Sequence, residues 1–280
     1  MDITQLRNQL RQTGAPTLVM GILNVTPDSF SDGGLFVDPD AAVEQALKME
    51  RDGADLIDIG GESTRPGSEP VPFDVERERV LPVIKKIRAR SSITISVDTY
   101  KAELAREALL NGADLINDIS GFMFDLDLVD VVRDFNAPVI IMHIKGTPRN
   151  MQKDPRYTNL LAELTEFFRE RIKFARESGL DDSQIILDPG IGFGKRVEDN
   201  FEIIRKLKQI VDLGYPVMIG PSRKSFIGQT LNLPPDQRLE GTAAAVTAGI
   251  LNGARIVRVH DVQFMKRTTL IADAIRGVTA

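Results

Sequence analysis

The chain has 280 residues, of which 42% are hydrophobic and 27% charged, and a net charge of −5 at pH 7. This composition can build a substantial core, in one large domain or two small ones. The acidic balance argues against a nonspecific nucleic-acid surface, and the absence of cysteine excludes disulfides, thiolate metal sites and a cysteine nucleophile. No apolar run approaches the roughly 18 residues of a membrane span, and residues 1–7 lack the order of a secretory signal. We therefore expect a soluble cytoplasmic protein with no membrane partner.

Eight short apolar runs are suited to buried strands, and a helical pattern follows each of them. Eight strand–helix units without a Pro/Gly/Ser-rich linker predict a parallel α/β sheet, and their number fits one closed (β/α)8 TIM barrel over residues 1–280. A doubly wound open sheet is the alternative. The runs begin near Leu18, Leu56, Ile93, Leu115, Pro138, Ile185, Pro216 and Ile256.

Three of the helical patterns allow specific predictions. One helix should begin with Asp38 as its N-cap and Pro39 at its first position. Residues 201–211 form one apolar stripe, which predicts a second helix. In a third pattern, over residues 75–87, Pro82 should kink or break the helix because it lacks a backbone N–H.

Three connections that follow predicted strands are far longer than the ~2 to 6 residues usual for such loops. They cover residues 24–37, 62–73 and 143–159. In a barrel these loops lie on the carboxyl face, where active sites are found. We expect the loops after strands 1 and 2 to act as mobile lids, because both contain glycines that allow hinge motion.

Every predicted strand ends in a polar residue, and in a barrel all strand ends meet at one mouth. A single residue of this kind would be explained as a loop start or an N-cap. Eight of them together need a ligand rich in donors and acceptors, because buried polar groups are normally paired. The residues are Asn24; Asp58 and Glu62; Asp98; Asn117 and Asp118; His143; Asp188; Ser222 and Lys224; and Arg258 and His260.

These residues divide into two zones by their chemistry. The first combines carboxylates, an amide and a lysine, which suit the edge of a flat amino-heterocycle. It consists of Asp98, Asn117, Asp188 and Lys224. The second could hold a phosphate group and its Mg²⁺, which takes one or two protein oxygens in addition to phosphate. It consists of Asn24, Arg258 and His260, with Asp28 or Asp32 nearby.

Structural explanations remain for several of these residues. His260 could cap the last helix, Asp28 could cap a turn, and Asp58 is best read as structural. Residues 190–195 lack both the full GxGxxG pattern and the Gly-Lys-Ser/Thr pattern of nucleotide sites. We interpret them as a backbone turn that brings Phe193 to the pocket.

Seven segments resemble the dihydropteroate synthase family, in order along the chain from Leu18 to about Val262. The first two are highly specific, and the set as a whole makes a chance similarity improbable. One departure, Ile144-Lys145 where the family often has Met-Gln, affects no catalytic residue. The segments are GILNVTPDSFSDGG (21–34), GGESTRPG (60–67), NDISG (117–121), MHIKGTP (142–148), DPGIGFGK (188–195), SRKS (222–225) and RVHDV (258–262).

The resemblance implies a (β/α)8 barrel that joins p-aminobenzoate to 6-hydroxymethyl-7,8-dihydropterin pyrophosphate with Mg²⁺ present. It also implies folate biosynthesis, sulfonamide targeting and a homodimer, and it assigns a catalytic part to Lys224, Arg258, His260 and Asp98. The resemblance further implies that the pterin is bound by Asp98, Asn117, Met142, Asp188, Phe193 and Lys224. It implies that the diphosphate is bound by Asn24, Arg65, Arg258 and His260, and Mg²⁺ by Asn24 and Asp32. It implies that p-aminobenzoate is bound by Phe30, Thr64, Pro66 and Ser225.

An aromatic amine is already a nucleophile, so the difficult step is the departure of a highly charged group. Electrostatic stabilisation should therefore dominate, which favours a dissociative path through a methylene cation on the pterin. The lids would exclude water that competes for this cation. Two alternatives remain open: a pterin barrel of the methyltetrahydrofolate methyltransferase type, and a noncatalytic paralogue that only binds pterin.

Overall fold

The computed structural model describes residues 3–12, 14–26 and 38–278, and within them eight parallel strands form one sheet in the order β6-β5-β4-β3-β2-β1-β8-β7. A parallel bridge between Leu187 and Val217 joins the two edge strands, so the sheet closes into the predicted barrel. The strands are β1 Leu18–Asn24, β2 Leu56–Gly60, β3 Thr94–Asp98, β4 Leu115–Asp118, β5 Val139–Met142, β6 Ile185–Asp188, β7 Met218–Ile219 and β8 Ile256–Val259.

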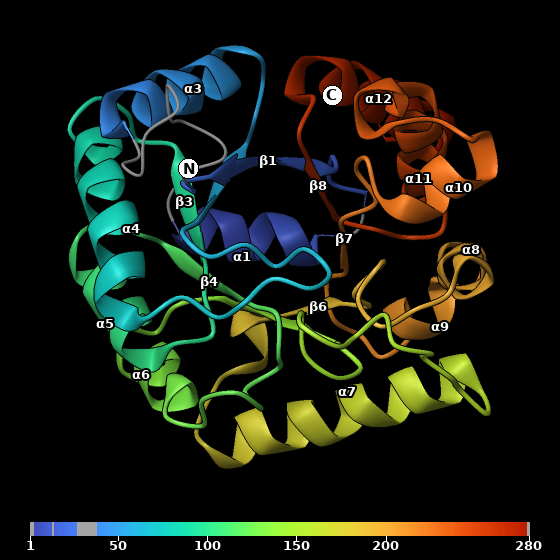
Figure 1. The fold of residues 1–280 in the computed structure, drawn as a ribbon, viewed down its shortest axis with the longest axis horizontal. Coiled ribbons are helices and arrows are strands. Elements are labelled where there is room, and N and C mark those ends of the chain that lie inside the picture. The colour runs from blue at the N-terminus through green and yellow to red at the C-terminus, as the bar shows by residue number, and fades with distance from the viewer. Residues whose placement is uncertain (1–2, 13, 27–37, 279–280) are drawn as a thin grey trace.

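Helices surround this barrel as an outer ring, and α1 lies across its middle (Figure 1). None of the described helices has the length and apolarity that a membrane crossing requires. The helices are α1 Ile3–Arg11, α3 Pro39–Arg51, α4 Phe73–Arg88, α5 Ala102–Leu110, α6 Leu128–Asp134, α7 Leu160–Glu177, α8 Val197–Arg205, α9 Lys208–Val211, α10 Ser225–Leu231, α11 Leu239–Leu251 and α12 Val262–Ile275, with short 3-10 turns at Asp182–Gln184 and Pro235–Gln237.

The three helix predictions had different outcomes. Asp38 is the N-cap of α3, as predicted, and its side chain accepts a hydrogen bond from the Asp40 N–H. The helix predicted over residues 201–211 is instead split into α8 and α9, because Lys206 leaves the helical conformation with φ −110° and ψ 20°. Of the kink or break expected at Pro82, the break does not occur, since α4 continues through the proline. Buried apolar side chains on both sides of the proline keep this helix packed on the sheet.

The interior of the barrel has an apolar lower layer that α1 closes. Leu6 and Leu10 of α1 pack against residues that point inward from the strands. Alternate residues of a strand point to the same side, so the residue two positions further along each strand faces the carboxyl mouth. The inward residues packed with α1 are Leu18, Met20, Leu56, Leu115, Ile140, Ile186, Met218 and Ile256.

This alternation explains the position of the polar zone. Asp58, Asn117, Asp188 and Arg258 each follow one of these apolar residues by two positions. Apolar packing thus fills the half of the barrel next to α1, and the polar side chains point into the half at the carboxyl mouth. The long connections after β2 and β5 leave from this same end, as predicted.

Candidate active site

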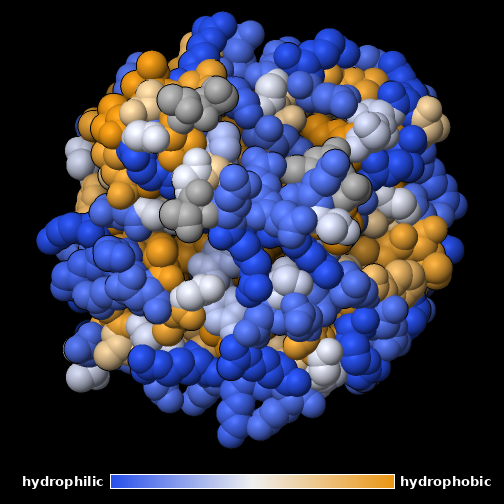
Figure 2. Space-filling view, turned by 180° about the vertical axis from the view of Figure 1, so that it is seen from behind, coloured by the Kyte–Doolittle hydropathy of each residue, from blue (hydrophilic) through white to orange (hydrophobic). Residues whose placement is uncertain are grey.

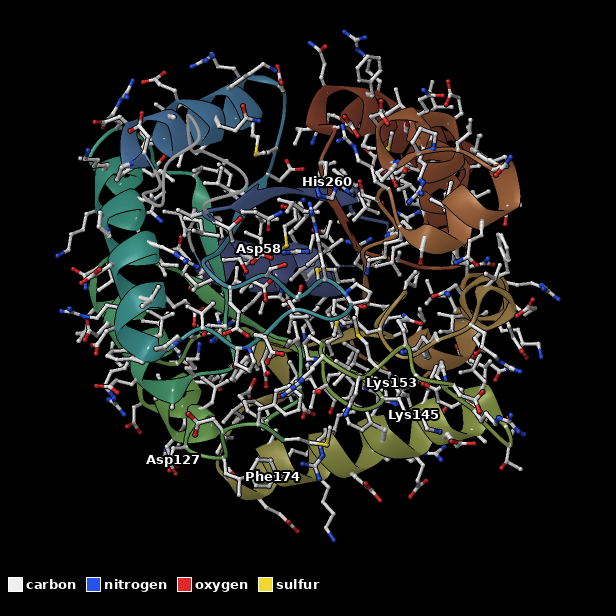
Figure 3. All side chains as sticks on the ribbon, viewed as in Figure 1. Asp58, Asp127, Lys145, Lys153, Phe174 and His260 are labelled. Atoms are coloured by element: carbon white, nitrogen blue, oxygen red, sulfur yellow. The ribbon has the colours of Figure 1, made fainter. Side chains whose placement is uncertain are left out.

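Arg258 lies between two buried carboxylates inside the barrel mouth. Its Nε donates to Asp58 Oδ2 at 2.6 Å, and its Nη2 donates to Asp98 Oδ2 at 2.8 Å. Asn117 Nδ2 donates to the same Asp58 oxygen at 2.9 Å. Figure 3 shows Asp58 near the centre of the ring of helices, with His260 further toward β8. Strands β2, β3, β4 and β8 therefore contribute to one network of charged hydrogen bonds.

Two acceptors of this network have no partner in the described structure. They are Asp58 Oδ1 and Asn117 Oδ1, both shielded from solvent. Burial raises the pKa of Asp98 well above its usual range, and the Arg258 cation acts in the opposite direction. Since buried polar atoms in proteins are normally paired, a ligand with N–H donors would satisfy this zone.

Asp188 and Lys224 form the other side of the same zone. Asp188 is almost fully buried at the end of β6, and its Oδ1 accepts the Gly190 N–H at 2.8 Å. Burial raises the pKa of Asp188, and the nearby Lys224 charge lowers it. Burial also lowers the pKa of Lys224 to about 8, and Asp188 opposes that shift. The two side chains thus stabilise each other's charged forms in a dry environment.

Apolar side chains border this polar edge. Met142, at the end of β5, is buried in a small cluster with Ile119, Ile144 and Met151, and the Phe193 ring packs against that cluster. The Lys224 ammonium lies 4.5 Å from the centre of the Phe193 ring. The pocket therefore has a polar edge and apolar faces, which suits a flat heterocycle.

Asn24, Arg223 and His260 line one end of a separate cavity of about 400 Å³, which we call the rim cavity and whose other lining comes largely from β1, α3 and the start of α12. His260 Nδ1 lies 3.0 Å from Ser222 Oγ. Burial and the Arg258 charge lower the pKa of His260 to about 4, so its ring is neutral at pH 7. Arg223 is held by Asp261 through two hydrogen bonds. The side chains predicted for diphosphate thus lie in two places. Asn24 and His260 line the cavity, whereas Arg258 bonds to the carboxylates of Asp58 and Asp98.

The described residues hold no group of three or more His, Asp or Glu side chains that could bind a metal alone. Asn24 nevertheless fits Mg²⁺, because its half-buried amide at the end of β1 opens on the rim cavity. One or two protein oxygens are enough when phosphate supplies the other ligands. Asp28, Asp32 and Phe30 lie outside the described residues.

Of the residues predicted for p-aminobenzoate, the structure describes Thr64, Pro66 and Ser225. Thr64 is half-buried and Pro66 is exposed on the connection after β2, where Arg65, predicted for diphosphate, is exposed as well. Ser225 is exposed at the first position of α10. Pro66 and Ser225 therefore face solvent, and Thr64 does so in part.

The stem of the connection after β2 contains a buried cluster that the sequence did not reveal. Lys101 Nζ donates to Glu62 at 2.8 Å, and it also pairs with the buried Glu76. Glu62 in turn accepts the Val71 N–H at 2.8 Å and the Tyr100 hydroxyl at 3.1 Å. Glu62, expected at the mouth, therefore ties together the two ends of this loop.

Lys195 is a second residue to which sequence analysis gave no role. It is almost fully buried, with only 3% of its surface accessible, and its Nζ lies 3.0 Å from His143 Nδ1. Burial lowers the pKa of Lys195 to about 7, and Asp188 acts to raise it. The sequence signal for such a role was the position of Lys195 at the end of the glycine-rich turn. Its partner could not be predicted, because His143 is 52 residues away.

Comparison with known proteins agrees with this geometry. The family model for pterin binding enzymes matches residues 20–260. A dihydropteroate synthase of Synechocystis is 49% identical over 94% of this chain and 91% of its own length. The Yersinia pestis dihydropteroate synthase, solved with a sulfonamide drug complex, superposes with a TM-score of 0.90 at 41% identity, covering 95% of this chain and 96% of the other.

A Xanthomonas albilineans dihydropteroate synthase, solved with 4-aminobenzoic acid, has a TM-score of 0.89 at 41% identity over 95% of this chain and 96% of the other. Identity of this order over nearly the whole length of each relative leaves the methyltransferase-type barrel without support. The chain belongs to the pterin-binding enzymes and, among them, to the dihydropteroate synthases of folate biosynthesis.

Proposed function

We propose that the buried polar zone of this transferase binds the pterin ring of 6-hydroxymethyl-7,8-dihydropterin pyrophosphate, which then reacts with p-aminobenzoate. The observation that carries this proposal is the pair of buried acceptors without partners, Asp58 Oδ1 and Asn117 Oδ1, beside the carboxylates of Asp98 and Asp188. Pterin rings present several N–H donors on one edge, so such a ring would supply the missing hydrogen bonds. Met142 and Phe193 would cover its faces, and Lys224 would donate to its edge.

The diphosphate would lie toward the rim cavity beside Asn24 and His260. His260 is neutral and serves as a hydrogen-bond donor, while Arg258 and Lys224 supply positive charge from below. Arg65 would reach the same group from the connection after β2. Asn24 and Asp32 would hold Mg²⁺, which neutralises charge on the leaving group when bound.

The protein need not activate the amine, because the nitrogen of p-aminobenzoate is nucleophilic as it stands. The proton that this nitrogen loses when the C–N bond forms passes to the released pyrophosphate or to water. Fixed cations at the mouth stabilise the charge that grows on departing pyrophosphate. The buried carboxylates of Asp98 and Asp188 favour positive charge developing on the pterin methylene. Both effects support a dissociative substitution. Phe30, Thr64, Pro66 and Ser225 would close the amine site and keep water away from the cation.

A homodimer is part of this proposal, and α11 and α12 offer a face for it. Apolar side chains gather in this region at the upper left of Figure 2, on a surface that is otherwise largely hydrophilic. Patches of this kind mark interfaces, and a two-fold contact would bring the same apolar patch of each copy together. The exposed apolar residues of the two helices are Leu251, Phe264, Leu270, Ile271 and Ile275.

We further propose one pterin-binding domain over residues 1–280, because all the strands belong to one sheet. The cytoplasmic location stays a prediction of the sequence. The decisive experiment is the formation of 7,8-dihydropteroate from the two substrates with and without Mg²⁺. We expect product only with the metal, and an active protein in excess chelator would contradict the Mg²⁺ assignment. Sedimentation of the wild type and of Ile271→Glu tests the dimer.

A further inference from the structure

Four consecutive backbone carbonyls in the turn after β6 each accept a hydrogen bond from a side chain. Lys224 donates to the Ile191 carbonyl, and Gln152 Nε2 donates to the Gly192 carbonyl at 2.7 Å. Lys195 Nζ donates to the Phe193 carbonyl at 3.0 Å, and the Tyr157 hydroxyl donates to the Gly194 carbonyl at 2.7 Å. The donors come from the loop after β5, from the turn itself and from the start of α10.

The turn depends on such donors because it makes few bonds of its own. Gly190, Gly192 and Gly194 all have positive φ, at 67°, 82° and 64°, a conformation that side chains disfavour. A Cβ at Gly190 would lie 2.0 Å from the His143 carbonyl oxygen, so the turn runs directly against the end of β5. Within the turn, a backbone hydrogen bond joins the Phe193 N–H to the Gly190 carbonyl.

The turn carries two groups of the pterin pocket at once. The Phe193 ring packs on the apolar cluster of Met142. The Lys224 ammonium lies above that ring and donates to the Ile191 carbonyl, two residues before Phe193 in the turn. A shift of this backbone would therefore displace both the apolar face and the cation of the pocket.

We propose that Gln152, Tyr157 and Lys195 are positioning residues for the pterin site, which hold the turn at residues 191–194 so that Phe193 and Lys224 meet the ring in the right place. This inference rests on the proposed function. It gives the long loop after β5 a specific part, which is to brace the pocket from outside through Gln152 and Tyr157. These three side chains need not touch the substrate.

A purely structural role for the same bonds would have a different signature. It would lower stability and leave pterin affinity unchanged in the folded protein. Gln152 is exposed and Tyr157 is half-buried, so Gln152→Ala and Tyr157→Phe each remove a hydrogen bond without opening a cavity. Lys195→Met is a third variant, but it changes a buried charge, and the inference does not depend on its folding.

The test is titration calorimetry of each variant with 6-hydroxymethyl-7,8-dihydropterin. Loss of one hydrogen bond should weaken binding by about 2- to 10-fold in Gln152→Ala and in Tyr157→Phe, with little change in Tm. Tyr215→Phe is the matched control, because its hydroxyl bonds to Asp182 at the amino end of the barrel, and its affinity should equal that of the wild type. In a Phe193→Ala background the Gln152 and Tyr157 effects should become smaller, because part of each effect acts through Phe193 and the rest through Lys224.

Unchanged pterin affinity in both Gln152→Ala and Tyr157→Phe would overturn the inference. It would also be overturned if these two changes reduced the affinity of Phe193→Ala as much as they reduce that of the wild type. The wild type and Asp188→Asn distinguish this from a failure of the proposed function. If the wild type binds the pterin and Asp188→Asn does not, the proposed site stands, whatever the brace variants do. If the wild type does not bind it, the proposed function and this inference both fall.

Discussion

The buried Asp58 and the partly buried Arg258 form an ion pair that joins β2 to β8, with Nε and Oδ2 2.6 Å apart and 200 positions between them in the chain. Asp58 is completely inaccessible to solvent. Removing one partner of such a pair leaves the other charge uncompensated. The pair therefore links the stability of the barrel to the shape of its mouth.

The first prediction follows from this pair. Asp58→Ala should lower the free energy of unfolding by about 3 to 5 kcal/mol, because Arg258 would remain buried with half its partners. Urea denaturation measures this change. Asp127→Ala serves as control, since Asp127 is exposed and far from the mouth (Figure 3), and it should stay within about 0.5 kcal/mol of the wild type. A loss below 1 kcal/mol in Asp58→Ala would mean that water enters and solvates Arg258.

The second prediction concerns Asp188. Asp188→Asn should weaken pterin binding by roughly 10- to 100-fold, because charge-assisted bonds to ring N–H donors are worth about 1.5 to 3 kcal/mol. The fold should survive, since the amide oxygen can still accept the Gly190 N–H. Calorimetry with a dihydropterin provides the measurement, with the exposed Asp134→Asn as control. Equal affinity in the wild type and Asp188→Asn would remove Asp188 from the pocket.

The third prediction is a pH dependence that comes from Lys224. Its pKa in the free enzyme is lowered to about 8 by burial, so the cation is present below that pH and is lost as the pH rises through it. Because kcat/KM reports groups of the free enzyme, it should fall above about pH 8. Lys224→Arg keeps its charge at all these pH values, so its profile should stay flat there even if activity is lower. A fall at the same pH in Lys224→Arg would assign the titration to another group, with Lys195 the first candidate.

The fourth prediction tests the dissociative path. Enzyme, Mg²⁺ and pterin diphosphate without p-aminobenzoate should release some pyrophosphate and hydroxymethyl-dihydropterin, because water can capture the pterin cation. Positional isotope exchange in recovered substrate is the more sensitive measurement. The absence of both signals in enzyme that is active with the amine would favour a concerted displacement.

The fifth prediction concerns the order of binding. p-Aminobenzoate should bind measurably only after the pterin diphosphate site is filled, because Arg65 and Pro66, which we assign to diphosphate and to p-aminobenzoate respectively, lie on the same connection. Ordering by the first ligand lowers the cost of binding the second, a coupling typically worth about 1 to 3 kcal/mol. Equilibrium binding of labelled p-aminobenzoate, with and without Mg²⁺-pyrophosphate and a pterin, measures it. Equal affinity in both conditions would indicate a preformed amine pocket.

The loop after β5 gives this coupling a physical route. The Gly67 N–H donates to the Pro148 carbonyl at 2.9 Å, and Arg149 pairs with Glu69 at 3.2 Å. The same loop reaches the turn of Phe193 through Gln152. The connection after β2 and the pterin pocket thus share one supporting segment, and Arg149→Ala should reduce the coupling between the two ligands.

The sequence by itself determined the barrel and the polar residues at its mouth. Eight apolar runs with helical patterns between them are local features, and the period of two places Asp58, Asn117 and Arg258 on the same inner surface as the apolar residues two positions earlier. The N-cap of α3 was equally local, because Asp38 and its hydrogen-bond partner are two residues apart.

Only the tertiary structure decided which of these polar groups pair. The bonds of Arg258 to Asp58 and Asp98 form because strands distant in sequence meet at one end of a closed sheet, and the resemblance, which assigns Arg258 to diphosphate, does not predict them. Pro82 stays inside α4 because burial of the helix face outweighs one missing hydrogen bond. The brace at residues 191–194 is of the same kind, since Gln152, Tyr157 and Lys224 lie tens of residues from the carbonyls they bond, and no periodicity or motif records a contact between a side chain and distant backbone.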